Sequence, residues 1–285
     1  MNNNILNLLN TLEIERLVEL KKFGSIALVV FAIFLLFFIK FRSNLLPILG
    51  LGFFVLIGSY YMINTKYREQ VQNYLLPKLV SEVDSDFKYK KDKKADIELL
   101  NSLKFFSQKI EDKNHEGTVS LKKDDKSVDI SLVRLESVKV DTEEGRHYTP
   151  RFDGAFIVFD LGERYDQTYL LSSTHSKTPE FEAGDYINPP HMGLKATGVK
   201  EGGLVLYSQS GESALSKESM QKMIALKDEL GKEIWVIFFK DSVYVLADDV
   251  AKGFEVSLFS SLKEQGYISE VAKLLEAVKG LIKEK

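Results

Sequence analysis

Cysteine is absent from this chain, and histidine, proline and tryptophan are scarce. The 285 residues include 4 histidines, 6 prolines and 1 tryptophan. Without cysteine the chain can form no disulfide, no thiolate nucleophile and no cysteine-ligated zinc site. The four histidines are His115, His147, His175 and His191. They are widely spaced and match no pattern of paired metal ligands. The sequence therefore predicts no metal site.

Catalytic and nucleotide-binding motifs are also missing. The chain has no GxxxxGK[ST], no GxGxxG and no GxSxG, the patterns that bind phosphates or present a nucleophilic serine. Ser-x-x-Lys occurs at Ser85/Lys88 and again at Ser260/Lys263, in unrelated contexts, so this short pattern is weak. A net charge of −3 lacks the basic excess of nucleic-acid-binding proteins. We expect no cofactor, no catalytic residue of a recognised type and no nucleic-acid partner.

Two uncharged apolar stretches near the N-terminus are the strongest signal in the sequence. They cover residues 23–39 and 45–63 and are separated by five residues. As helices, these 17 to 19 residues rise roughly 26–28 Å, close to the ~30 Å hydrocarbon core of a bilayer. Because the connecting segment is long enough only for a tight reversal, the pattern predicts a two-helix transmembrane hairpin with spans at about 23–41 and 45–63.

Two other interpretations of these stretches are weaker. A cleavable signal peptide does not fit, because Glu13, Glu15 and Glu19 precede the first stretch and no small-residue cleavage motif follows it. Apolar core helices of a soluble protein rarely run this long without a polar residue on some face.

The charges that flank the stretches predict the orientation. Five positive residues lie on the side that both termini share, namely Arg16, Lys21, Lys22, Lys66 and Arg68. Two lie in the turn, namely Lys40 and Arg42. Under the positive-inside rule both termini, and with them the soluble domain, face the cytoplasm. The expected location is the inner (cytoplasmic) membrane, with more than one pass.

Helical patterns flank the predicted hairpin. Residues 4–20 have leucines at helical spacing with charges between them, which predicts an amphipathic helix. Residues 67–84 have a second apolar stripe, in which Pro77 should kink or divide the helix. The lysine-rich segment 88–94 is suited to anionic headgroups or to a solvated linker, and we interpret it as a linker because acidic residues dilute its charge. We assign residues 64–115 to a helical connector.

From residue 118 onward the apolar period becomes that of strands. Short β-branched or aromatic runs, bounded by glycine, aspartate and proline, lie near 128–140, 156–159, 169–171 and 204–207. Residues 234–247 predict a hairpin around Lys240-Asp241-Ser242. Ser216 and Gly231 are the expected first and last caps of a helix, and 268–282 predicts a C-terminal amphipathic helix. This order predicts one α+β domain at 116–285 with a mainly antiparallel sheet.

Several segments together resemble the bacterial domain-of-unknown-function 3137 family, in which two membrane spans precede one α+β domain. The similar segments are 74–89 (YLLPKLVSEVDSDFKY), 152–160 (FDGAFIVFD), 203–223, 234–247 and 254–259 (FEVSLF). Where relatives tend to begin the helix with Thr-Pro, this chain has Leu215-Ser216-Lys217. The family has no established activity, so the resemblance implies no catalytic residue. It implies a role in the bacterial envelope and, because members often neighbour LemA-type membrane proteins in genomes, a partner of that type.

The sequence therefore predicts a membrane-anchored, non-enzymatic module for protein interaction or an envelope-associated role. Its expected partners are the lipid bilayer and another membrane protein. The candidate partner-binding residues are Tyr186, Asn188 and His191, in the long loop 181–193 (FEAGDYINPPHMG). Two alternatives stay open: the loop is only an irregular connection, or the soluble domain is an enzyme or small-ligand receptor whose site follows no recognised pattern.

Overall fold

The chain forms two compact units. The computed structural model describes residues 3–40, 45–106, 108–112, 117–141, 145–173, 189–250, 256–262 and 266–283. Unit 1 comprises Met1–Leu79 together with Glu255–Ile268, and unit 2 comprises Val80–Phe254 together with Ser269–Lys285. The division expected from the sequence, into 1–63, 64–115 and 116–285, stays a prediction.

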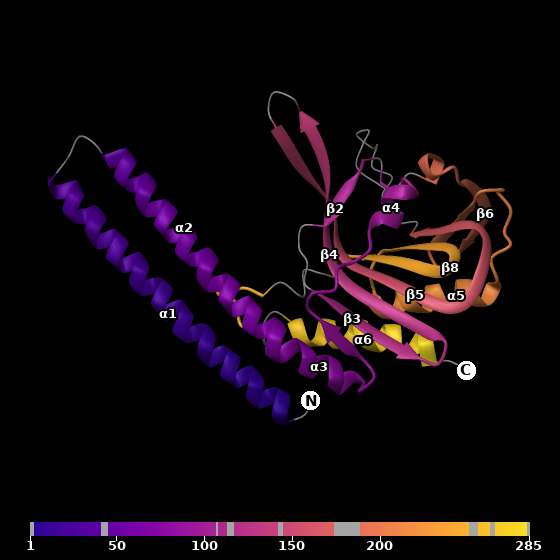
Figure 1. The fold of residues 1–285 in the computed structure, drawn as a ribbon, viewed down its shortest axis with the longest axis horizontal. Helices are drawn as coiled ribbons and strands as arrows, with labels where there is room; N and C mark the ends of the chain where they lie inside the picture. The colour runs from indigo at the N-terminus through magenta and orange to yellow at the C-terminus, as the bar shows by residue number, and fades with distance from the viewer. Residues whose placement is uncertain are drawn as a thin grey trace. The chain divides into compact units, whose positions relative to one another are not determined.

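Unit 1 is built on two long helices, α1 (Asn3–Lys40) and α2 (Leu45–Gln70). The predicted amphipathic lead and the first apolar stretch are one continuous helix, because no proline or glycine pair interrupts them. Glu19 of α1 is 3.2 Å from Lys66, whereas Phe23, one turn later, has its ring 6.0 Å from that of Tyr60. Later residues of α1 thus meet earlier residues of α2, so the two helices are antiparallel and lie side by side (Figure 1).

A π-helical turn follows α2 and precedes Pro77. This turn, η1 (Val71–Leu75), leads directly into α3 (Leu76–Val83), and the backbone N–H of Leu76 donates to the carbonyl of Val71, five residues earlier. Proline has no N–H to donate and its ring crowds the carbonyl four residues before it, so a wider turn at this point relieves the helix. The kink or division expected near Pro77 takes the form of this π-helical turn, in a helix that otherwise continues.

Unit 2 is an α+β unit with an eight-stranded sheet. The strands are β1 (Lys88–Lys90), β2 (Ile110–Asp112), β3 (Thr118–Lys123), β4 (Lys126–Asp141), β5 (Gly145–Ser173), β6 (Lys195–Glu201), β7 (Leu204–Ser208) and β8 (Ile234–Asp248). Their order is β1-β3-β4-β5-β7-β6, with β2 also on β4 and β8 also on β5. Every strand pair among the described residues is antiparallel, which confirms the predicted α+β class with a mainly antiparallel sheet.

The predicted hairpin is wrong, and the predicted linker is wrong in its first three residues. Residues 234–247 form the single strand β8, which runs through Lys240-Asp241-Ser242 where the sequence predicts a turn. This strand stays paired with β5 from Gly154↔Asp248 to Ser172↔Trp235, and irregularities in register opposite this point let both strands bend without ending. Lys240 has a positive φ of 55°, so the turn-like residues produce the bend. The lysine-rich segment predicted as a linker begins with the edge strand β1, and exposed lysines on an edge discourage pairing with other chains.

Four helical elements accompany the sheet. They are α4 (Glu98–Ser102), the 3-10 turn η2 (Pro189–Met192), α5 (Lys217–Leu230) and α6 (Tyr267–Lys283). Both predicted caps of α5 are confirmed: the Ser216 side chain accepts from the Ser219 N–H, and Gly231 ends the helix in the left-handed conformation with φ 64°. Lys273 of α6 donates to the carbonyl of Leu230 at 2.9 Å, which joins the end of α5 to α6.

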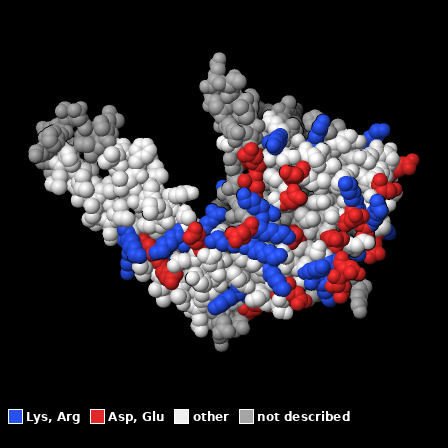
Figure 2. All heavy atoms as spheres, viewed as in Figure 1, with Lys and Arg blue, Asp and Glu red and all other residues white. Residues whose placement is uncertain are grey.

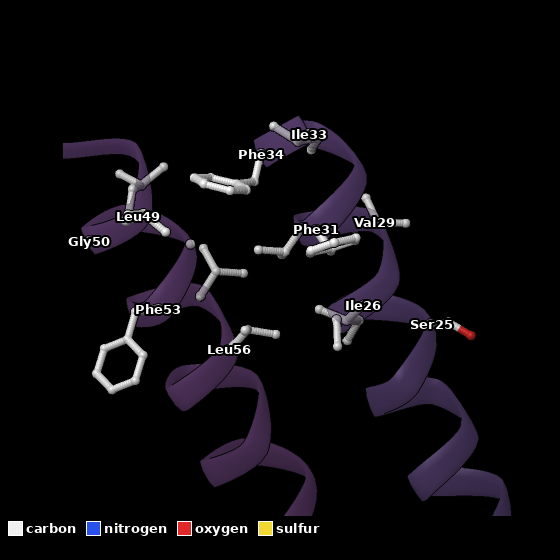
Figure 3. A pocket seen from close by; sticks show the side chains of 15 residues that line it. Ser25, Ile26, Val29, Phe31, Ile33, Phe34, Leu49, Gly50, Phe53 and Leu56 are labelled. Carbon is white, nitrogen blue, oxygen red and sulfur yellow. The ribbon is translucent and has the colours of Figure 1, made fainter. Parts of the chain in front are cut away.

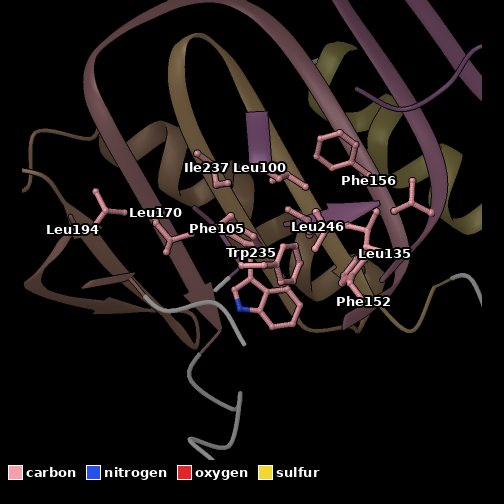
Figure 4. Close-up of a cluster of buried hydrophobic side chains, with 13 residues drawn as sticks. Leu100, Phe105, Leu135, Phe152, Phe156, Leu170, Leu194, Trp235, Ile237 and Leu246 are labelled. Atoms are coloured by element: carbon pink, nitrogen blue, oxygen red, sulfur yellow. The ribbon is translucent and has the colours of Figure 1, made fainter. Parts of the chain in front are cut away.

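Both faces of the sheet are covered. One face packs on the segment around α4, in a cluster that includes Leu100, Phe105, Leu135 and Phe156. Trp235 meets Phe152 edge to face in this cluster, with ring centroids 6.4 Å apart (Figure 4). Helices α5 and α6 lie on the other side of the sheet (Figure 1). Their buried side chains recur at three- and four-residue spacing, as in an amphipathic helix: Met220, Met223, Leu226 and Leu230, and then Val271, Leu274, Leu275, Val278 and Ile282.

Gly154 predicts a sharp difference between two glycine substitutions. A Cβ at Gly154 would overlap the carbonyl oxygen of Ala247 and lie 2.7 Å from the Phe152 ring, whereas a Cβ at Gly280 on α6 meets nothing within 4 Å. We expect Gly154→Ala to lower the free energy of unfolding by about 1–3 kcal/mol. Gly280→Ala should leave it unchanged or raise it by up to ~1 kcal/mol, because alanine favours helix. Thermal unfolding of the full chain measures both, and equal melting temperatures for the two variants would contradict the close approach at Gly154.

Candidate functional site: the apolar helix pair

The environment of α1 changes at Phe23. Before this residue, buried side chains recur every three or four positions, at Ile5, Leu9, Leu12, Arg16 and Glu19. From Phe23 to Phe38 the helix has no buried side chain, although nearly every residue is apolar. The first part of α1 therefore packs along one face, whereas the second part exposes apolar side chains on every face.

Helix α2 shows the same exposure in its first part. No side chain from Leu49 to Lys66 is buried, and Phe54 is the most exposed large apolar residue of the described chain, at 77%. The space-filling view shows an end of the helix pair without charged side chains (Figure 2). Between Phe23 and Asn64, large apolar side chains at least 60% exposed lie on both helices: Leu28, Phe31, Leu36, Leu51, Phe53, Phe54, Tyr61 and Met62. A patch of this kind on a protein surface marks a membrane or protein contact.

One helix among the described residues is long and apolar enough to cross a membrane. It is α1, over Ile5–Phe38, and no residue of its most apolar window is buried. Of the two predicted spans, only the first is therefore supported by the described residues. In α2 the side chains of residues 45–48 lie outside the described part.

A wide apolar groove separates the two helices. It has a volume of about 1250 Å³ and is lined almost wholly by apolar side chains, among them Ile26, Phe34, Leu49 and Phe53 (Figure 3). The helices come close at Gly52, where a Cβ would lie 3.1 Å from Val30. Elsewhere in the groove the side chains of α1 and α2 leave space between them, so the pair buries little of its own apolar surface.

Charged side chains begin immediately beyond the apolar part. Glu19 accepts from Lys22 at 2.8 Å and from Lys66 of α2 at 3.2 Å, which links the two helices one turn before Phe23. The Lys22 hydrogen bond is the main reason that the pKa of Glu19 lies below its usual value, so this carboxylate is ionised at neutral pH. The ammonium groups of Lys22 and Lys66 belong to half-exposed side chains and can also meet lipid phosphates, at about 1 kcal/mol each near an anionic surface.

A buried guanidinium holds a distant part of the chain against the helices. Arg16, 7% exposed, donates to Glu13 and also to the carbonyl of Leu258 at 2.9 Å. The N–H of Leu258 in turn donates to the side chain of Asn64 at 2.9 Å. We call residues 256–262 the return segment, because it follows unit 2 in sequence yet belongs to unit 1.

The return segment contributes Phe259 to an aromatic cluster at the boundary of the apolar part. The Phe259 ring stacks on Tyr60 at 5.2 Å and meets Phe23 edge to face at 5.9 Å. The sequence shows this segment only as the apolar run FEVSLF, and its contacts depend on single polar residues of α1 and α2. Burial raises the pKa of the neighbouring helix residue Tyr67, so its phenol stays neutral at physiological pH.

The predicted binding loop is not described at its key positions. Tyr186 and Asn188 lie outside the described residues, and so does the side chain of His191, whose backbone is part of η2. The side chains of the other three histidines lie outside the described part as well. Within the part of the chain that the structure describes, no three acidic or histidine side chains are grouped as metal ligands.

Unit 2 has a polar hollow of its own, of about 530 Å³, near the end of α5. Its lining includes Lys227, Lys232, Glu233 and Asp249. Lys232 donates to the carbonyl of Asp249 at 3.1 Å and lies 3.5 Å from its carboxylate. Glu233 Oε2 is buried and accepts no hydrogen bond from the described residues. The hollow has the polar character of a small-ligand site. The described residues of its lining include no serine, threonine, cysteine or histidine, so they lack the usual pair of nucleophile and base.

Asn64 provides a direct test of the return segment. We expect Asn64→Ala to remove the acceptor of the Leu258 N–H, at a cost of about 1 kcal/mol, and to speed hydrogen exchange at that amide roughly fivefold. Asn73→Ala, at an exposed asparagine of the π-helical turn, is the matched control and should leave the exchange rate unchanged. Equal exchange rates in both variants would show that Asn64 does not hold the segment.

One comparison with known proteins, with a family model, agrees with the resemblance. Residues 207–284 match the family model described as "Protein of unknown function (DUF3137)". No curated protein matches the chain. Among solved structures, the crystal structure of the mycobacterial trehalose monomycolate transport factor A, TtfA, aligns with 72% of this chain and 92% of its own, at 12% identity and a TM-score of 0.33. The C-terminal part of the chain, from β7 to α6, thus resembles the domain-of-unknown-function 3137 family, as its sequence predicts.

Proposed function

We propose that this protein is a two-pass membrane protein in which α1 and α2 anchor unit 2 as a non-enzymatic module for protein interaction or an envelope-associated role. The observation that carries the proposal is the exposure of apolar side chains around both helices beyond Phe23 and before Asn64. In water each large side chain left exposed forgoes about 1.5–3 kcal/mol. In hydrocarbon this cost disappears, and the helices satisfy their own backbone hydrogen bonds there.

The contacts of α1 favour a permanent anchor over a removable signal sequence. An apolar helix near the N-terminus fits either role by length and composition. However, α1 is tied to α2 through Glu19 and Lys66, and to the return segment through Arg16 and Leu258. Removal of α1 would break these links and leave the Leu258 carbonyl and the Lys66 ammonium without these partners.

The second pass and the orientation follow from α2 and the flanking charges. Residues 49–63 of α2 are as exposed and apolar as their neighbours on α1, so the bilayer that accepts one helix also accepts the other. The excess of lysine and arginine lies at the end of the pair marked by Lys22 and Lys66. The positive-inside rule favours the cytoplasm for this end and for unit 2, in the inner membrane of a bacterium.

Anchoring also fits a binding role. A protein that shares a bilayer with its partner meets it at high effective concentration, so a modest contact surface is sufficient. The loop with Tyr186, Asn188 and His191 remains the candidate surface, and a LemA-type membrane protein is the candidate partner that the family resemblance supplies.

A small-ligand receptor is the second candidate function, and the polar hollow of unit 2 is the observation that favours it. A buried carboxylate oxygen of Glu233 without a described partner is suited to a ligand that carries hydrogen-bond donors. Cationic amines tested against the unaltered chain and Glu233→Gln distinguish the two functions, because a receptor would lose affinity in the variant.

The membrane topology is testable because the chain has no cysteine. We expect the full chain to stay with membranes during alkaline carbonate extraction. We also expect Ala225→Cys, at an exposed position of α5, to react with a membrane-impermeant maleimide in inverted vesicles and not in intact spheroplasts. Release by carbonate would contradict the anchor, whereas labelling in spheroplasts would reverse the orientation and leave the anchor in place.

The interaction role predicts the result of exchanging the helices. Replacing residues 23–63 with an unrelated two-span hairpin should preserve a near-stoichiometric partner in affinity purification from mild-detergent membranes, because the proposed contact lies on unit 2. The matched control is the same hairpin without this chain. A partner that is lost on exchange would place the contact on α1 and α2, and purification of both forms without any partner would contradict the interaction role.

A further inference from the structure

We propose that the return segment is a third membrane contact, which inserts Phe259 into the boundary between headgroups and acyl chains of an anionic bilayer. This inference rests on the proposed anchor and adds to it a surface from the opposite end of the chain. The surface consists of the contacting rings of Phe23, Tyr60 and Phe259, and it adjoins the exposed apolar side chains of α1 and α2.

The position of Phe259 is unusual for a side chain with good packing partners. Its ring contacts both Tyr60 and Phe23, yet 57% of the residue is exposed. Two turns after Phe23 in α1, and two turns before Tyr60 in α2, the exterior of each helix is wholly apolar. An exposed aromatic ring at the edge of such a surface is what the interfacial zone of a bilayer accepts, because aromatic residues are enriched there.

Backbone N–H groups of the return segment have the internal hydrogen-bond partners that a position with little water requires. Irregular backbone near hydrocarbon needs internal partners for its N–H groups. Three consecutive N–H groups have them: Leu258 donates to the Asn64 side chain at 2.9 Å, Phe259 to the Ser257 hydroxyl at 3.2 Å, and Ser260 to the Ser257 carbonyl at 3.4 Å. The Leu258 carbonyl accepts from the buried Arg16. The segment thus exposes the Phe259 ring while the N–H groups around it have partners within the protein.

Charge complementarity identifies the occupant as anionic lipid. Lys22 directly precedes Phe23 in α1, Lys66 lies between one and two turns from Tyr60 in α2, and their side chains are 55% and 61% exposed. Both share the single carboxylate of Glu19, so this cluster keeps a net positive charge beside the aromatic surface. Lipid phosphates at this level would meet the ammonium groups while the rings lie at the acyl boundary.

Tryptophan fluorescence tests the depth of Phe259 directly. The chain has one tryptophan, Trp235, which is buried in the core of unit 2 and provides a constant background. The probe is Phe259→Trp, which keeps an aromatic ring for the stack, in the full chain reconstituted into phosphatidylethanolamine–phosphatidylglycerol vesicles with brominated acyl chains. The matched controls are Leu28→Trp, on the exposed apolar part of α1, and Ala225→Trp, on exposed α5.

We expect the fluorescence of Phe259→Trp to be quenched by bromine near the headgroup end of the acyl chain, at a shallower depth than that of Leu28→Trp. The fluorescence of Ala225→Trp should not be quenched. Replacing phosphatidylglycerol with phosphatidylcholine should weaken the quenching at position 259, and equal quenching would overturn the role of the lysines. If position 259 behaves like 225 while 28 is quenched, the inference fails and the anchor stands. If none of the three is quenched, the anchor itself fails, and the inference fails with it.

A cysteine label at the same position guards against a folding defect in the tryptophan variant. Phe259→Cys carrying a nitroxide should be more accessible to oxygen than to a water-soluble nickel complex in the same vesicles. Spin–spin broadening between labels would show a second copy on this surface, and protection from both reagents would show another protein there. Either result would overturn the lipid contact.

Discussion

The rest of the structure depends on one change along α1, which occurs at Phe23, where a helix with one buried face becomes a helix with exposed apolar side chains on every face. Up to this residue the helix buries one face in unit 1, and beyond it the helix offers apolar side chains in all directions. A helix of the second kind needs surroundings that are apolar on every side. The antiparallel partner α2 cannot supply them, because the groove between the helices leaves much of the apolar surface open. The charges of Glu19, Lys22 and Lys66 mark the boundary between the two regimes.

Arg16 converts this boundary into a point where separate parts of the chain meet. Its guanidinium is buried, and such a group is tolerated only with full hydrogen bonding. Glu13 supplies one partner on the same helix, and the Leu258 carbonyl supplies another from 242 residues later in the sequence. Asn64 on α2 completes the arrangement through the Leu258 N–H. Three segments are thus held together by the hydrogen bonds of one cation and of the backbone of one residue, Leu258.

The features that sequence predicts well are those with a local cause. Ser216 and Gly231 cap α5 through their own side-chain and backbone preferences, and Pro77 disturbs its helix through its missing N–H. The apolar stretches are visible from composition alone. The turn predicted at Lys240 fails because pairing with β5 on both sides of this residue, a contact between distant residues, overrides a turn-like tripeptide.

The candidate site shows the same division between local and distant causes. The cations beside the apolar part are apparent in the sequence because they flank it. The return segment is not, since no periodic pattern tells that FEVSLF will bind a side chain of α1 and another of α2. Length and composition favour binding by the loop with Tyr186, Asn188 and His191, but the side chains of these three residues lie outside the part that the structure describes.

The π-helical turn at Val71–Leu75 sets the phase between two stretches of one rod. A turn with one extra residue advances every later side chain by roughly 100° around the helix axis relative to uninterrupted α-helix. Buried side chains lie within the turn and after it, at Val71, Leu75, Leu76, Leu79 and Val80, so this advance decides which way the later ones face. A one-residue deletion within the turn would therefore leave a smoother helix whose apolar stripe points the wrong way, so this site tolerates a change of residue far better than a change of length.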